Sequence, residues 1–476
     1  MDVAAAPYGL PIPSSSSEEV IGQLAYFSNS PLNNDSSNHP VAIIGIHGSG
    51  RDARAMFHRL MTTVKQRIRS GCDGVGSNDT IDNKIDDEDL TTYTEQDNFL
   101  VITPWFLCPA DDCPPPPSLH GNGTRSLPYL RWIDDPVGSL QIEHSFRYGA
   151  ESIPPINNDD DITDDYTTMK NNATVSSYFV MDVLLETLCN RSKYPNLSKI
   201  IVVGHSAGGQ LVHRWGLMSG SWCFGDDDTN VGFITKTDDD ITASTKDDIT
   251  NYSMPSIRLV VANPRSFTYL DRRRYLPNTT TTSPSSNDDH KQDSNALEFR
   301  LPTNSEVDEC PYYNRYMWGI EDNPDLPAPY ITKNIERLMK TVQHSHHCDS
   351  SVTTVEEALF CRYASRDVVY LAGENDTQIV EEQISCGDGY QGQMRRDRSE
   401  RYHSSLQMIG KEIFTRLRQD VTMGKDEEWS RFITRFHSTH TDGEEIRIHR
   451  RLVVKDVGHE GGRMWKSDEG RMGMFD

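Results

Sequence analysis

The sequence predicts an α/β protein whose mostly parallel sheet carries helices on both faces. Short runs rich in valine and isoleucine, such as residues 41–46 and 257–262, alternate with longer segments of helical spacing. Strands buried on both faces of a parallel sheet have this continuous apolar character, because helices cover both sides. In addition, the run at residues 200–203 leads through residues 204–208 (Gly-His-Ser-Ala-Gly) into a helical segment, which makes a strand–turn–helix unit.

Each element follows from its local pattern: uninterrupted apolar runs predict strands, and apolar residues recurring every three or four positions predict helices. The expected helices are residues 52–69 and 177–190, besides the one after residue 208. Their apolar stripes are Met56, Leu60, Val64 and Ile68 in the first and Phe179, Val183, Leu184 and Leu188 in the second. The expected strands are residues 21–27, 41–46, 99–103 (ended by Pro104), 200–203, 257–262, 368–372 and 452–457.

The chain of 476 residues is expected to form a polar N-terminal lead-in, residues 1–40, followed by a single domain, residues 41–476. Four low-complexity segments rich in Asp, Ser, Thr and Asn interrupt this domain between the expected elements, where insertions are tolerated. They lie near residues 71–98, 153–172, 225–250 and 277–297. We expect partly disordered loops there, because this composition cannot bury enough apolar surface to fold by itself.

The net charge of −24 is concentrated in a few segments rather than spread over the domain. Residues 79–97, 159–165 and 226–248 hold 21 acidic residues and three lysines, which gives 18 of the 24 net negative charges. Acidic runs of this kind are usually solvated loops, although calcium or a basic partner would also suit them. The sign of the charge argues against nucleic acid as a partner.

No stretch approaches 18 consecutive apolar residues, so a membrane span is not expected. The first 20 residues have neither the basic start nor the apolar centre of a standard signal peptide, which slightly favours the cytoplasm over secretion. Nine Asn-x-Ser/Thr sequons nevertheless keep a secreted protein open as the alternative.

The nine cysteines include no Cys-x-x-Cys pair, so no zinc framework is expected. Cys108 and Cys113 flank a short loop whose length is compatible with a disulfide. Residues 344–348 (His-Ser-His-His-Cys) lie in a polar connection and are interpreted as a solvated loop rather than a metal site.

Ser206 is the candidate nucleophile. A serine at the apex of a strand-to-helix turn with the pattern Gly-x-Ser-x-Gly is typical of the nucleophile elbow of serine hydrolases. The turn strains the backbone of the serine, so its neighbours must be small, and Gly204 and Gly208 supply the room. The following helix points its N-terminus at the reacting centre, which favours developing negative charge.

The orienting acid and the base are expected at the ends of two later strands. Strand 368–372 runs into residues 373–376 (Gly-Glu-Asn-Asp), where Asp376 is the expected acid and Glu374 the alternative, because either could reach an imidazole. His459 follows the last strand in a loop flanked by glycines. Its imidazole would take the proton of Ser206 and return it to the leaving group.

Residues 47–50 (His-Gly-Ser-Gly) follow the first strand of the domain and are expected to complete an oxyanion hole. Glycines there allow backbone N–H groups to approach a substrate oxygen closely. The expected donors are the backbone N–H of Ala207 and an N–H from Gly48 or Ser49. His47 is interpreted as a residue that shapes this loop through hydrogen bonds.

Together these motifs resemble the α/β-hydrolase superfamily from about residue 41 to about residue 465, and Ser206, Asp376 and His459 stand in its chain order. A closer resemblance is to a poorly characterised microbial and fungal branch of this superfamily. The resemblance implies an α/β-hydrolase fold and a serine hydrolase that uses neither a metal nor an organic cofactor. The segments that carry it are residues 47–53 (His-Gly-Ser-Gly-Arg-Asp-Ala), 204–210 (Gly-His-Ser-Ala-Gly-Gly-Gln), 262–266 (Ala-Asn-Pro-Arg-Ser) and 391–396 (Gln-Gly-Gln-Met-Arg-Arg).

The function expected from the ordered triad is hydrolysis of a carboxylic ester through an acyl-enzyme, with a small ester or acyl compound as the substrate. A peptidase or amidase on the same triad is the alternative, because nothing in the sequence separates ester from amide chemistry. The third interpretation is a non-catalytic binding protein that retains the scaffold, which insertions blocking the pocket of Ser206 would favour. The substrate's acyl and alcohol groups and the oligomeric state are left open.

Overall fold

The protein is described by a computed structural model over part of its sequence. The described residues are 7–15, 19–32, 38–72, 98–111, 127–132, 145–153, 174–220, 254–277, 297–321, 329–344, 354–379, 385–422, 441–442, 445–446 and 448–476. The four predicted insertions lie almost wholly outside these ranges. Cys113 and three members of the histidine-rich cluster, His346, His347 and Cys348, also lie outside them.

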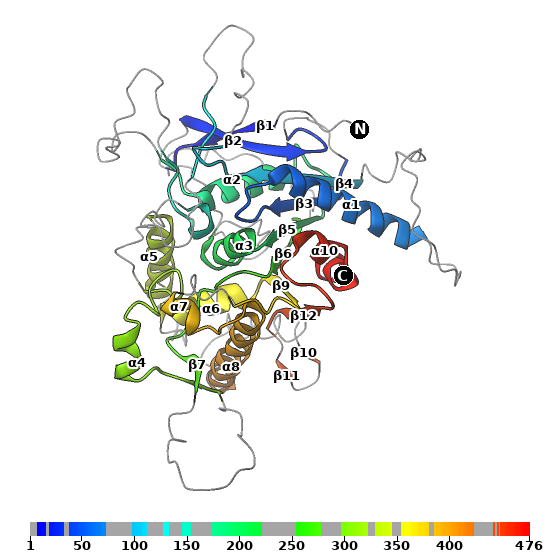
Figure 1. Ribbon diagram of the computed structural model, residues 1–476. Helices are drawn as coiled ribbons and strands as arrows, with labels where there is room; N and C mark the ends of the chain where they lie inside the picture. The colour runs from blue at the N-terminus through cyan, green and yellow to red at the C-terminus, as the bar shows by residue number, and fades with distance from the viewer. Residues whose placement is uncertain are drawn as a thin grey trace.

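The centre of the molecule is an eight-stranded sheet with the strand order β1-β2-β4-β3-β5-β6-β9-β12 (Figure 1). The two strands at one edge run antiparallel to their neighbours, and the remaining strands are parallel. This is the mostly parallel sheet that the sequence predicts. The strands are β1 (Tyr8–Pro13), β2 (Val20–Ser28), β3 (Val41–Ile46), β4 (Phe99–Trp105), β5 (Lys199–His205), β6 (Ser256–Ala262), β9 (Asp367–Gly373) and β12 (Arg450–Val454).

Successive side chains of a strand point to opposite sides, so each strand presents apolar side chains to both faces of the sheet. Helices bury both of these faces. On β5, Ile200 and Val202 belong to one apolar cluster, whereas Ile201 and Val203 belong to another. The first cluster includes residues of α2 (Ser177–Cys189), α3 (Ala207–Met218), α6 (Val355–Ala364) and α8 (Arg395–Thr422). The second includes residues of α1 (Ala53–Cys72), α10 (Gly461–Lys466) and α11 (Asp468–Phe475). In Figure 1, α3 and α10 accordingly lie on opposite sides of the central strands.

Smaller elements surround this core. They are η3 (Phe146–Tyr148), the hairpin of β7 (Arg274–Pro277) and β8 (Leu297–Arg300), α4 (Asn304–Glu309), α5 (Pro329–His344), α7 (Cys386–Gly389), and the short pair β10 (Thr441–Asp442) and β11 (Glu445–Ile446). A disulfide between Cys310 and Cys386 joins the end of α4 to the start of α7. Sequence reasoning missed this bridge, which closes a separation of 76 residues.

Three details of the strands differ from expectation. Strand β1 was not predicted, because its six residues contain two prolines; β1 lies at the sheet edge, where a missing N–H is tolerated. Strand β4 continues through Pro104 to Trp105 instead of ending before the proline. Strand β12 ends at Val454 rather than at residue 457, because the chain turns at Asp456, which has a left-handed φ of 55°.

Cys108 is a free thiol in the structure, so the disulfide considered between Cys108 and Cys113 is not formed. Within the described ranges, no helix combines the length and the apolar character that crossing a membrane requires.

Candidate active site

Ser206 occupies a sharp turn between β5 and α3. Its backbone has φ 57° and ψ −116°, a conformation that non-glycine residues rarely adopt. Two backbone hydrogen bonds fix it: the N–H of Ser206 donates to the carbonyl of Ala262 at 3.0 Å, and the carbonyl of Ser206 accepts from the N–H of Gln210 at 3.0 Å. The strained elbow predicted from the sequence is therefore present.

The glycines of this turn are required by close backbone packing. A Cβ on Gly204 would lie 2.2 Å from the carbonyl oxygen of Gly208, and a Cβ on Gly208 would lie 2.3 Å from the carbonyl oxygen of Ile46. Backbone atoms cannot retreat as a flexible side chain can, so neither position tolerates a side chain. The prediction that Gly204 and Gly208 supply room for the elbow is confirmed.

The structure brings Ser206, Asp376 and His459 together at the carboxyl ends of β5, β9 and β12. The Nε2 of His459 lies 3.0 Å from the Oγ of Ser206, and its Nδ1 lies 2.9 Å from the Oδ2 of Asp376. An ionised carboxylate only accepts hydrogen bonds, so Nδ1 carries the proton in the neutral imidazole and Nε2 is left to accept from the serine hydroxyl. The His459 side chain is partly accessible to solvent, at 32%, whereas only 1% of the Asp376 side chain is accessible.

Asp376 is buried yet kept ionised. Burial alone would raise its pKa, but the hydrogen bond from His459, the charge of that imidazole when protonated and the charge of Arg395 outweigh burial, so the pKa of Asp376 lies below its usual value. Nη1 of Arg395 lies 3.5 Å from Oδ1 of Asp376, the oxygen that His459 does not use. The carboxylate is thus held from both sides.

Glu374, the alternative acid, points elsewhere. Its carboxylate accepts a hydrogen bond from the backbone N–H of Asp456 at 3.1 Å, and its side chain is exposed. Of the two candidates, only Asp376 lies against the imidazole of His459.

His205 packs beside the imidazole of His459, with the ring centroids 4.8 Å apart. Burial, followed by repulsion from His459, lowers the pKa of His205 to about 3. The imidazole is therefore neutral at neutral pH and packs between the His459 ring and Gly461, where a Cβ would lie 3.2 Å from it. This role is local packing rather than proton transfer.

The loop 47–50 passes close to Ser206. A Cβ on Gly48 would lie 3.7 Å from the Cβ of Ser206, which is an ordinary contact distance. The N–H of Phe106 donates to Nε2 of His47 at 3.1 Å, so Nδ1 carries the proton and donates to the carbonyl of Gly48 at 2.8 Å. His47 thus shapes the loop through hydrogen bonds, as expected. Ala207 begins α3 directly after Ser206.

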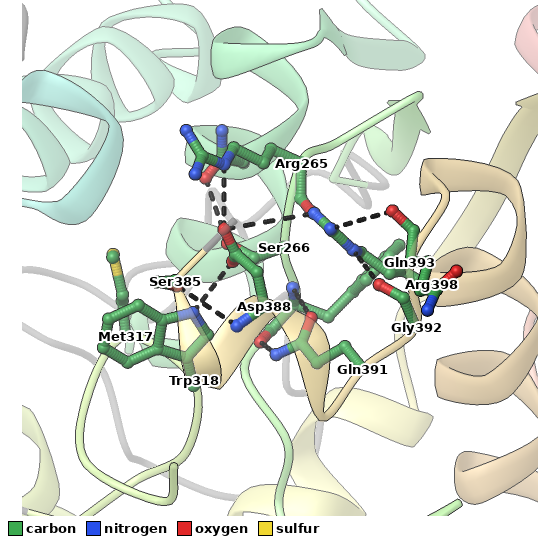
Figure 2. A network of polar contacts seen from close by, with 12 residues as sticks. Arg265, Ser266, Met317, Trp318, Ser385, Asp388, Gln391, Gly392, Gln393 and Arg398 are labelled. Atoms are coloured by element: carbon green, nitrogen blue, oxygen red, sulfur yellow. Dashed lines mark hydrogen bonds and ion pairs between the residues drawn. The ribbon is translucent and has the colours of Figure 1, made fainter. Parts of the chain in front are cut away.

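Arg395 is the site neighbour that sequence reasoning missed, and a dense polar network holds the segment that carries it (Figure 2). Arg398, one turn further along α8, donates to the carbonyls of Arg265, Gly392 and Gln393 at 2.7, 2.6 and 3.1 Å. Gln391 both accepts from and donates to the backbone of Phe267.

A buried carboxylate stands at the centre of this network. Asp388 accepts from Nε of Arg265 and from the indole N–H of Trp318, both at 2.9 Å. The bonds of Arg398 to Arg265, Gly392 and Gln393 join the segments 262–266 and 391–396, which the sequence singled out without assigning them a role. They anchor the first turn of α8, from which Arg395 reaches Asp376.

Among the residues that the structure describes, no group of three or more histidines, cysteines or acidic residues is arranged to hold a metal ion. The site described above contains one carboxylate against the imidazole of His459 and arginine on its other side, an arrangement that suits proton transfer better than cation binding.

Solved structures of similar fold include hydrolytic enzymes of low sequence identity. A poly(3-hydroxybutyrate) depolymerase, LpqC, from Bordetella parapertussis is 12% identical, with 97% of this chain and 87% of that chain covered and a TM-score of 0.41. Poly(aspartic acid) hydrolase-1 from Sphingomonas sp. KT-1 is 11% identical, with 99% and 100% covered and a TM-score of 0.42. These scores are below 0.5, so the likeness says nothing about the reaction of this chain. No protein-family model and no curated protein matches the sequence.

Proposed function

We propose that the protein is a serine hydrolase, and more narrowly a carboxylic ester hydrolase that works through an acyl-enzyme. The observation that carries the proposal is the pair of hydrogen bonds made by His459, at 3.0 Å to Ser206 and at 2.9 Å to Asp376. A nucleophile, a base and an orienting acid in this geometry are what acyl transfer needs.

In the first half-reaction, Oγ of Ser206 attacks the ester carbonyl carbon while its proton moves to Nε2 of His459. The carboxylate of Asp376 holds the Nδ1–H and stabilises the imidazolium that forms. Collapse of the tetrahedral intermediate breaks the bond to the alcohol oxygen, which takes the proton from Nε2. Water then attacks the acyl-enzyme by the same route, and the acid and free Ser206 are released.

The oxyanion of the intermediate would be held by backbone N–H groups of Ala207 and of Gly48 or Ser49. The closeness of Gly48 to Ser206 and the start of α3 at Ala207 support this assignment. The positive end of α3 adds a favourable potential at the same place.

An ester is proposed rather than an amide because an alcohol is a better leaving group than an amine, so the tetrahedral intermediate collapses over a lower barrier. The segments 262–266 and 391–396 are also two of the four, with 47–53 and 204–210, on which the resemblance to the microbial and fungal branch rests.

The proposal is tested by Ser206→Ala, assayed on p-nitrophenyl esters of several chain lengths and labelled with a fluorophosphonate. We expect kcat to fall by about 10⁴-fold or more and labelling to disappear, because the nucleophile is lost. Ser365→Ala, at an exposed serine whose hydroxyl donates to the carbonyl of Arg362, is the matched control. Labelling that persists unchanged in Ser206→Ala would contradict the proposal.

A further inference from the structure

Asn263 lies at the carboxyl end of β6, between the strand that leads to Ser206 and the strand that leads to Asp376. Its backbone is left-handed, with a φ of 42°, and only 2% of the residue is accessible. Asparagine is one of the few residues that adopt this conformation readily. A buried amide must find partners for both its oxygen and its nitrogen, so the two partners show what the side chain does.

Those partners come from two different loops. Oδ1 of Asn263 accepts from the backbone N–H of Gly373 at 2.8 Å, and Nδ2 donates to the carbonyl of Gly458 at 2.9 Å. Gly373 begins the turn that carries Asp376, whose N–H donates to the carbonyl of Gly373 at 3.1 Å. Gly458 immediately precedes His459.

The backbone around Asn263 reaches the remaining part of the site. The preceding carbonyl, that of Ala262, accepts from the N–H of Ser206 at 3.0 Å, and the N–H of Asn263 donates to the carbonyl of Leu371 at 3.0 Å. The packing is tight, because a Cβ on Gly373 would lie 2.5 Å from the carbonyl oxygen of Gly458. The loops of the acid and the base bond directly to each other, from the N–H of Asn375 to the carbonyl of Val457 at 2.9 Å, and the side chain of Asn263 bonds to both loops at the glycines nearest the site.

We infer that Asn263 is a positioning residue, which ties the loops of Asp376 and His459 together and so sets the distance between carboxylate and imidazole. The inference rests on the proposed function. Neither glycine nor aspartate can replace the amide, although both tolerate a left-handed backbone. Glycine makes neither bond, and ionised aspartate cannot donate to the carbonyl of Gly458.

The experiment compares Asn263→Gly and Asn263→Asp with the wild-type chain. Both substitutions keep the backbone conformation accessible. We expect kcat on a p-nitrophenyl ester to fall about 100-fold with little change in KM, because displacement of a catalytic group costs about this factor while substrate binding is retained.

A second measurement separates positioning from general stability. The proton between His459 and Asp376 is expected to give a far-downfield imidazole N–H resonance in wild-type protein, assigned by its absence in His459→Ala. It should be lost or strongly weakened in both Asn263 variants. The matched control is Asn334→Ala, which removes another buried asparagine whose Nδ2 donates to the carbonyl of Tyr330 in α5. This control should keep both the resonance and kcat.

Unchanged kcat and resonance in Asn263→Gly would overturn the inference. Full activity in Asn263→Asp would also overturn it, because the bond to Gly458 would then be dispensable. The inference and the proposed function can fail separately: absence of labelling in wild-type protein removes the proposed function, whereas the resonance tests the tie between the two loops without any turnover.

Discussion

The part of the site that carries Ser206 and the part that carries Asp376 and His459 are held in place by different means. Around Ser206, glycines allow backbone to pack on backbone, and a Cβ at Gly204 or Gly208 would overlap carbonyl oxygens. Around Asp376 and His459, polar side chains add to the backbone bond between the two loops: Asn263 bonds to both loops, and Arg395 faces the carboxylate.

This difference teaches where each part can fail. The turn at Ser206 depends on glycines without side chains, so a side chain added at Gly204 or Gly208 would disturb the fold itself. The acid and histidine loops depend on single polar groups from remote segments, so substitutions there should change catalytic rate more than stability. The following predictions test this contrast.

The largest effect is expected for Gly208→Ala. The new Cβ would lie 2.3 Å from the carbonyl of Ile46 and 2.6 Å from that of His47, so the elbow or β3 must shift, at a cost of about 3 kcal/mol in the free energy of unfolding. The free energy of unfolding is measured by urea denaturation. Gly50→Ala is the control, because a Cβ there meets nothing within 4 Å, and its effect should stay within about 0.5 kcal/mol. Equal stability of the two variants would refute the contrast.

A smaller effect concerns pH and comes from His205. Its pKa is about 3 in the folded state against about 6.5 for a free histidine, so the unfolded chain takes up the proton first as the pH falls. The stabilisation is fully present above pH 6.5 and is lost toward pH 3, at up to about 1.4 kcal/mol per pH unit. In His205→Gln, the free energy of unfolding should fall less steeply between pH 6 and pH 4, by up to about 1.4 kcal/mol per pH unit. Above pH 7.5 its dependence on pH should be unchanged. A decline of equal steepness in the variant would contradict this origin.

The smallest effect is expected for Arg395→Gln. Loss of the cation 3.5 Å from Asp376 should lower kcat/KM about tenfold, or about 1.4 kcal/mol, because the guanidinium is one of several groups that keep the carboxylate ionised. Arg395→Lys should retain part of the activity. Arg401 lies further along α8 and donates to the carbonyl of Tyr275, so Arg401→Gln is the control for loss of an arginine. The measurement is the rate of ester hydrolysis at several pH values. Wild-type rates for Arg395→Gln would show that Arg395 does not affect the function of Asp376.

The central sheet could be predicted because its strands are continuous apolar runs, as in β3 and β5, which a local window detects. The helices α1 and α2 were found by their apolar stripes. Helix α8 was not, since its start at Arg395 is densely charged and its place depends on contacts with residues more than 100 positions away, such as that of Arg398 with Arg265. The same holds for the disulfide of Cys310 and Cys386, which spacing along the chain does not specify.

Within the site, the residues expected from sequence are those whose motifs are complete within a few positions. Ser206 has its glycines beside it, and His459 stands in a loop flanked by glycines after an apolar run. Asp376 and Glu374 remained alternatives because two carboxylates two positions apart differ only in where the turn points them. Asn263 and Arg395 act through contacts with loops that are distant in the chain, so their residue type alone gave no role.

The strand order of the sheet has one consequence for synthesis on the ribosome. Ser206 follows β5 at the middle of the sheet, but His459 follows β12, which comes after all other strands of the main sheet in chain order. A nascent chain can therefore fold its elbow while it still lacks a base, and β12 must pair with β9 before the imidazole reaches the serine. Under the proposed function, hydrolytic activity would report that the last strand has been made and docked, and unfinished chains would be inert toward esters inside the cell that makes them.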